Sequence, residues 1–85
     1  MADSVSKRIV VIDDERAILA TLQAILQRRG YEVEVAPNAA QGRARIAARA
    51  PDLVLLDLGL PDADGLDLLK ELRDTRPALQ IIILT

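Results

Sequence analysis

Four short apolar runs, separated by longer segments with helical spacing of apolar residues, constrain the fold of this 85-residue chain most strongly. The runs are rich in Val, Ile and Leu and occupy residues 8–12, 31–36, 53–56 and 81–84. Short aliphatic runs bounded by polar residues indicate buried strands. Between them, the spacing predicts helices over residues 16–29, 38–50 and 66–76. Strands that alternate with helices predict an α/β fold with a parallel sheet and right-handed crossovers.

Details of the pattern refine this prediction. The 31–36 run alternates apolar and acidic residues, so we expect this strand at an edge of the sheet, with one face in water. Gly30 suits the left-handed position just after the first helix. Gly42 lies inside the second helix, where glycine costs about 1 kcal/mol relative to alanine. The predicted inward-facing residues of the helices are, in chain order, Ile18, Leu19, Leu22, Ile25 and Leu26, then Ala40, Ala44 and Ala47, then Leu66, Leu69 and Leu72.

Composition narrows the possible chemistry. The chain has no Cys and no His, which excludes thiolate and Ser-His catalysis and Cys- or His-based metal sites within it. A formal net charge of -2 gives no sign of general nucleic-acid binding. No apolar stretch reaches the length of a membrane span, and the polar start has no signal-peptide core. We therefore expect a soluble cytoplasmic protein that binds neither nucleic acid nor membrane.

Aspartates follow two of the predicted strands. Asp13 and Asp14 come directly after the first strand, and Asp57 comes directly after the third. Taken alone, each of them is better explained as a helix cap or a turn former. In an open parallel sheet, however, sites lie outside the carboxyl ends of adjacent strands, so these carboxylates would meet at one edge. Like charges held together are costly without a cation, and an all-oxygen ligand set suits Mg²⁺.

Two further residues belong to the same predicted edge. Gly59 lies two residues past Asp57, and its missing side chain would let its backbone carbonyl turn toward the metal, although an ordinary turn glycine fits the sequence as well. Thr85 ends the fourth strand, so its hydroxyl should reach the same edge. Pro61 and Gly65 are interpreted as structural residues that rigidify the loop and begin the third helix.

Taken together, the motifs resemble those of a known family, the receiver domains of two-component response regulators. The resemblance covers residues 7–85 and is carried by residues 10–15 (VVIDDE), 51–57 (PDLVLLD), 60–65 (LPDADG) and 81–85 (IIILT). It implies a flavodoxin-like, doubly wound parallel sheet of strand order 2-1-3-4-5. The family continues with a fourth helix, a fifth strand ending in Lys and a fifth helix. We therefore expect residues 1–85 to be a receiver domain incomplete at its C-terminus, seen here as βαβαβαβ, with residues 1–7 a flexible lead-in.

The resemblance also implies a role for each site residue. Asp57 stands at the phosphoacceptor position, Asp14 at that of a direct Mg²⁺ ligand, and Asp13 at that of a carboxylate acting largely through a metal-bound water. The carbonyl of Gly59 stands where the family contacts the metal, and Thr85 where a hydroxyl turns toward the phosphoryl group. The implied reaction is in-line attack by Asp57 on a phosphohistidine of a sensor histidine kinase or phosphotransfer protein. In the complete domain, slow autodephosphorylation and switching of a downstream output, such as transcription, would follow.

Three alternatives bear on this interpretation. A phosphatase of the haloacid dehalogenase type would need a DxDxT pattern, which residues 13–17 (DDERA) do not match. A flavin or nucleotide binder would need a Gly- or Ser/Thr-rich phosphate loop after the first strand, where the charged residues 13–15 (DDE) would instead repel phosphate without a metal. The remaining alternative is a truncated receiver that is not phosphorylated and acts as a dimerisation or protein-interaction module, for example through the open edge of the fourth strand. An apolar edge of this kind favours association, so we expect no stable 85-residue monomer.

Overall fold

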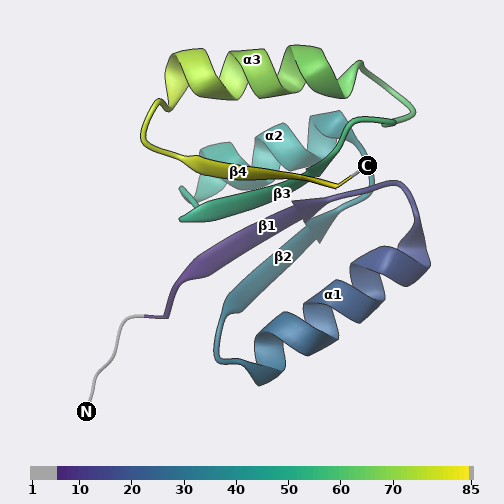
Figure 1. Ribbon diagram of the computed structural model, residues 1–85, viewed down its shortest axis with the longest axis vertical. Coiled ribbons are helices and arrows are strands. Elements are labelled where there is room, and N and C mark those ends of the chain that lie inside the picture. The colour runs from purple at the N-terminus through teal and green to yellow at the C-terminus, as the bar shows by residue number, and fades with distance from the viewer. Residues whose placement is uncertain (1–5, 85) are drawn as a thin grey trace.

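A computed structural model describes residues 6–84, with a sheet at its centre and helices on both faces (Figure 1). Within these residues, every predicted strand and helix is present. The elements, in chain order, are β1 (Arg8–Ile12), α1 (Arg16–Arg28), β2 (Glu32–Ala36), α2 (Ala39–Ala48), β3 (Leu53–Asp57), α3 (Gly65–Thr75) and β4 (Gln80–Leu84). The predictions for the lead-in over residues 1–7 and for the Thr85 hydroxyl fall largely or wholly outside the described part of the chain, so they stay predictions.

The strands form one parallel sheet in the order β2-β1-β3-β4. This confirms the flavodoxin-like doubly wound arrangement, and it confirms the edge position predicted for β2. The register places Ile12 of β1 opposite Leu56 of β3. Because the two strands are parallel and adjacent, the residues that follow Ile12 and Leu56 emerge at the same edge of the sheet.

Two hydrophobic clusters, one on each face of the sheet, form the core. Alternation along β1 sends Val10 and Ile12 toward α2 and α3, and Ile9 and Val11 toward α1, as expected for a central parallel strand. The larger cluster, on the α2 and α3 side, contains Val10, Ile12, Ala36, Ala39, Ile46, Val54, Leu56, Leu68 and Leu72. The smaller one, on the α1 side, contains Ile9, Val11, Leu19, Val33 and Leu55. Burial on both faces explains why β1 and β3 read as continuous aliphatic runs.

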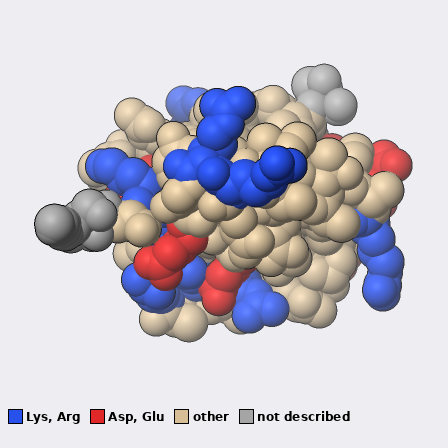
Figure 2. Space-filling model, turned by 90° about the horizontal axis from the view of Figure 1, so that it is seen from below, with Lys and Arg blue, Asp and Glu red and all other residues tan. Residues whose placement is uncertain are grey.

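Helix α1 buries a narrower stripe than predicted. Leu19 is buried and Leu22 and Leu26 are partly buried, but Ile18 is 36% exposed and Ile25 is 48% exposed. The reason is position: α1 contacts β1 and β2, so only side chains facing those strands are covered. The opposite face of α1 is solvated, and the charged residues of the helix are Arg16 and Arg28, one at each end. Figure 2, which views the molecule from the α1 side, shows Lys and Arg side chains in separate places around a large uncharged area, with acidic groups beside some of them.

The buried face predicted for α2 is wrong. Ala40, Ala44 and Ala47 are exposed, and the helix instead buries Ala39, Gly42 and Ile46. Gly42 decides this orientation, because a Cβ at that position would lie 2.5 Å from Cδ1 of the core residue Ile12. Glycine is therefore the residue that lets α2 approach β1 closely, and its intrinsic helix penalty is offset by that packing.

Helix α3 is rotated relative to the prediction as well. Leu68 and Leu72 are buried and Leu69 is partly buried, whereas Leu66 is 47% exposed. The helix begins at Gly65, after the N-cap Asp64, whose side chain accepts the N–H of Leu66. A Cβ on Gly65 would lie 2.4 Å from Cα of Leu58, so this glycine permits a close approach of helix and loop. No helix in the described residues has the length and apolar character needed to cross a membrane.

Candidate functional site

The three predicted aspartates converge at one edge of the sheet. Asp13 and Asp14 follow β1, and Asp57 ends the adjacent strand β3. Each offers a carboxylate oxygen, and these oxygens all lie within 4.8 Å of one another. The structure thus confirms that the strand ends bring these side chains together, as the parallel topology predicted.

Asp13 is the buried member of this acidic cluster, with a relative exposure of 3%. Its Oδ1 accepts the N–H of Glu15 at 2.8 Å, and its own N–H donates to the carbonyl of Ala36 at 3.1 Å. Burial raises the pKa of Asp13 above its ordinary 3.8, and the nearby charges of Asp57 and Asp14 add to the rise, while the Glu15 hydrogen bond opposes it. Without a cation, the cluster is therefore electrostatically unfavourable.

Asp57 and Asp14 are progressively more open to solvent. Asp57 is half-buried, and its Oδ1 accepts the N–H of Gly59 at 3.0 Å, which fixes the orientation of the carboxylate. Asp14 is exposed. The cluster therefore combines a buried carboxylate, a positioned one and an accessible one, and an incoming group can reach Asp57 from solvent.

Gly59 contacts the site through its amide group in this structure. The carbonyl contact to a metal is not tested here and stays a prediction. Nor does the position demand glycine: the positive φ among the described glycines belongs to Gly30, at 93°, which confirms the left-handed turn expected after α1. A Cβ on Gly59 would lie 3.7 Å from Oδ1 of Asp57, an ordinary contact.

The donor set fits a hard divalent cation. Mg²⁺ takes oxygen ligands and is usually bound by one or two carboxylates while keeping several waters. Asp13, Asp14 and Asp57 supply such oxygens, and their mutual repulsion would be relieved by positive charge. These residues would hold the ion, and the half-open face of the cluster leaves room for its waters and for an oxygen-rich substrate.

One residue at this edge was missed by the sequence analysis. Asp62, in the loop between β3 and α3, accepts the backbone N–H groups of Ala39 and Ala40 at 2.8 and 2.9 Å. These bonds hold the pKa of Asp62 below its ordinary 3.8. An aspartate in a turn-rich loop is read from sequence as a turn former. Its partners lie 23 and 22 residues earlier in the chain, so no local pattern indicated them.

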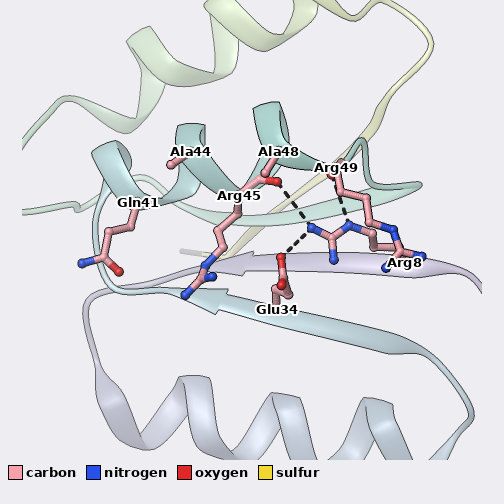
Figure 3. A pocket seen from close by; sticks show the side chains of 7 residues that line it. All are labelled: Arg8, Glu34, Gln41, Ala44, Arg45, Ala48 and Arg49. Carbon is pink, nitrogen blue, oxygen red and sulfur yellow. Dashed lines mark hydrogen bonds and ion pairs between the residues drawn. The ribbon is translucent and has the colours of Figure 1, made fainter.

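A hollow of about 500 Å³ runs along α2, between this helix and the strands β1 and β2 (Figure 3). Its central side chain is Arg8, which is 5% exposed. Arg8 donates to the carboxylate of Glu34 at 2.5 Å and to the carbonyls of Arg49 and Arg45 at 3.2 and 3.4 Å. Arg49 in turn pairs with Glu32. These charges compensate one another and tie β1 to β2 and α2, so we assign the hollow a structural role.

Comparison with known proteins agrees with this geometry. A profile of the family described as response regulator receiver domain matches residues 9–85. The response regulator MprA of Mycobacterium bovis is 40% identical over 80 residues, which cover 94% of this chain and 35% of MprA.

Solved structures agree with it too. A response regulator receiver domain protein from Methanospirillum hungatei superposes with a TM-score of 0.90 at 40% identity, over 93% of this chain and 63% of that one. A response regulator from Burkholderia pseudomallei, solved with a phosphorylated aspartic acid, a calcium ion and citrate, superposes with a TM-score of 0.86 at 35% identity, over 94% of this chain and 47% of that one.

The match extends through the whole described fold but not through the whole of the relatives. The chain spans less than half the length of the curated relatives it matches first. Within that span, the family profile takes in the acidic cluster, the β3–α3 loop and β4. The chain belongs to the response regulator receiver domain family.

Proposed function

We propose that this domain accepts a phosphoryl group on Asp57 from a phosphohistidine, held by a sensor histidine kinase or a phosphotransfer protein, in the presence of Mg²⁺. The observation that carries the proposal is the convergence of the Asp13, Asp14 and Asp57 carboxylates at the carboxyl edge of the sheet. Receiver domains of response regulators act with such kinases and phosphotransfer proteins. The related protein from Burkholderia pseudomallei, with its phosphorylated aspartic acid and calcium ion, supports the same chemistry.

Asp57 is the nucleophile in this proposal. Its Oδ1 is held by the Gly59 N–H, so Oδ2 is the oxygen that attacks phosphorus. The new O–P bond forms as the N–P bond of the phosphohistidine breaks in line with it, and the histidine nitrogen keeps the bonding electrons. The product is an acyl phosphate on Asp57, which water later removes.

Asp13 and Asp14, together with Asp57 and the Gly59 carbonyl, would hold the metal. When bound, Mg²⁺ neutralises charge on the transferred oxygens. After transfer, the charge on Asp57 recruits the Thr85 hydroxyl and biases the surface beside β4, which is the switch that an output function would read. Regulation of transcription is one such output, consistent with the response regulators among the relatives.

The direct test is Phos-tag electrophoresis of the chain after incubation with acetyl phosphate, with and without Mg²⁺. We expect a retarded band that requires Mg²⁺ and disappears in Asp57→Asn. Asp67→Asn, an exposed aspartate in the first turn of α3, is the matched control and should be retarded like the wild type. If Asp57→Asn is labelled as strongly as the wild type, the assignment is wrong.

A further inference from the structure

The loop between β3 and α3 is hydrogen-bonded to the start of α2. Asp62 lies in this loop, residues 58–64, and both oxygens of its carboxylate are engaged: Oδ1 by the N–H of Ala39 and Oδ2 by the N–H of Ala40, at 2.8 and 2.9 Å. These are the first two residues of α2. A carboxylate at a helix N-terminus also interacts favourably with the helix dipole.

This contact is more than helix capping, because α2 has a cap of its own. Asn38 is the N-cap residue, and its Oδ1 accepts the N–H of Gln41 at 2.8 Å. The orphan N–H groups of the first turn are thus divided between a local cap and a carboxylate from a distant loop. Loss of the Asn38 side chain removes one of these hydrogen bonds and loss of Asp62 removes two, but only Asp62 also connects that helix to the loop.

The same loop carries the groups that orient Asp57. Gly59 donates its N–H to Asp57, and the carbonyl of Leu58 accepts the N–H of Gly65. Among residues 6–84, the hydrogen bonds of this loop to anything beyond its own flanking strand and helix are those of Asp62. Leu58, Leu60 and Ala63 add apolar packing against the larger core cluster, but such contacts are not directional.

Asp13, on the other strand of the site, is also hydrogen-bonded close to the start of α2. Asp13 donates its N–H to the carbonyl of Ala36, which ends β2 just before α2 begins. A continuous path therefore runs from Asp13 to the end of β2, across the start of α2 at Ala39, and through Asp62 into the loop that holds Asp57. The two strand ends of the site are linked both through the sheet and through this path.

We propose that Asp62 is a positioning residue of the phosphorylation site. By accepting the first N–H groups of α2, its carboxylate fixes the position of the β3–α3 loop, and so the positions of Gly59 and of the Asp57 carboxylate relative to Asp13. The effect on phosphorylation rests on the proposed function, whereas the effect of Asp62 on the position of the loop does not. Loss of these hydrogen bonds lets the loop move, while the residues and the charge of the acidic cluster stay the same.

The test compares Asp62→Ala with Asn38→Ala, a matched control that removes a capping hydrogen bond from the same helix turn without touching the loop. Three quantities are measured for each variant of the chain: the ¹H–¹⁵N shift of the Gly59 amide in metal-free protein, the Mg²⁺ affinity by calorimetry, and the free energy of unfolding in urea. Asp62→Asn is added because its amide retains one acceptor oxygen and should behave as an intermediate.

We expect the Gly59 amide resonance to move in Asp62→Ala and to stay in place in Asn38→Ala. Mg²⁺ affinity should fall about tenfold in Asp62→Ala, in line with residues that orient metal ligands indirectly, and remain at the wild-type value in Asn38→Ala. Both variants should lose stability. If Asp62→Ala proves too unstable, the same readouts in Asp62→Asn decide, since one hydrogen bond is kept.

An unmoved Gly59 resonance, or Mg²⁺ affinity that falls equally in both variants, would show that Asp62 is only a helix cap and would overturn the proposal. Failure of the proposed function has a different signature. In that case the wild type itself would not be labelled at Asp57 by acetyl phosphate and Mg²⁺, while the Gly59 shift would still report whether Asp62 positions the loop.

Discussion

Replacing Asp14 with Asn should stabilise the metal-free protein and weaken its response to Mg²⁺. Asp14 is the exposed member of the acidic cluster. Asn has nearly the same shape as Asp but no charge, so the substitution removes repulsion with Asp13 and Asp57 and changes little else. The negative charge of Asp14 also attracts a bound cation. Asp14→Asn should therefore be more stable than the wild type without Mg²⁺ but gain less stability when Mg²⁺ is added.

The size of the effect follows from the separation of the groups. Their ligand oxygens lie within 4.8 Å of one another. At such a distance two unit charges repel by about 1 kcal/mol in bulk water and by about 3 kcal/mol at an effective dielectric constant near 20. Asp14 is exposed, so the lower figure applies to each of its two neighbours, and the favourable interaction with the N-terminus of α1 offsets about 0.5 kcal/mol. The net gain should be about 1.5 kcal/mol.

Thermal unfolding followed by circular dichroism, at low ionic strength and pH 7, measures this gain. In EDTA, Asp14→Asn should melt about 6–12 °C above the wild type, as expected for about 1.5 kcal/mol in a domain of this size. In millimolar Mg²⁺, the wild type should rise and the variant should respond much less. A variant that is less stable than the wild type in EDTA, or that gains as much from Mg²⁺, would refute the reasoning.

Further predictions concern the scaffold. The side-chain hydrogen bond from Arg8 lowers the pKa of Glu34 below its ordinary 4.5. The contribution of ionised Glu34 to the free energy of unfolding is therefore fully present above pH 4.5 and is lost as the pH falls through the lower pKa of the folded state. The Glu34 side chain is 39% exposed, so solvent screens the pair and Glu34→Gln should cost about 1 kcal/mol at pH 7. The difference from wild type in urea unfolding should shrink in acid, and a constant difference would contradict this. Gly65→Ala, whose Cβ would meet the Leu58 backbone, should cost about 2 kcal/mol, whereas Gly59→Ala should change stability by less than about 1 kcal/mol. Equal losses in the two glycine variants would be evidence against the close approach at Gly65.

The acidic cluster could be predicted from sequence because it depends only on local patterns and on topology. Each aspartate comes directly after an aliphatic run, and parallel strands bring their carboxyl ends to one edge. Adjacency of β1 and β3 then places Asp13 and Asp57 together. No long-range side-chain contact needed to be known in advance.

What could not be predicted depends on contacts between distant segments. The second helix is rich in Ala, so several of its faces look equally apolar, and the close approach of Gly42 to Ile12 selects the real one. Arg8 looks like a solvated strand end, but Glu34 and two carbonyls of the α2 end compensate its charge in the interior. Asp62 bonds a helix that precedes it by more than twenty residues. Such pairings leave no periodic signal in the sequence.

The central claim is that Asp57 is the phosphoacceptor of this domain. Intact-mass spectrometry after incubation with acetyl phosphate and Mg²⁺, followed by peptide mapping, tests it most directly. We predict the added mass of a single phosphoryl group, located on the peptide that contains Asp57, absent in EDTA and absent in Asp57→Asn. Phosphate found on another residue of the wild type, or undiminished labelling of Asp57→Asn, would contradict the claim.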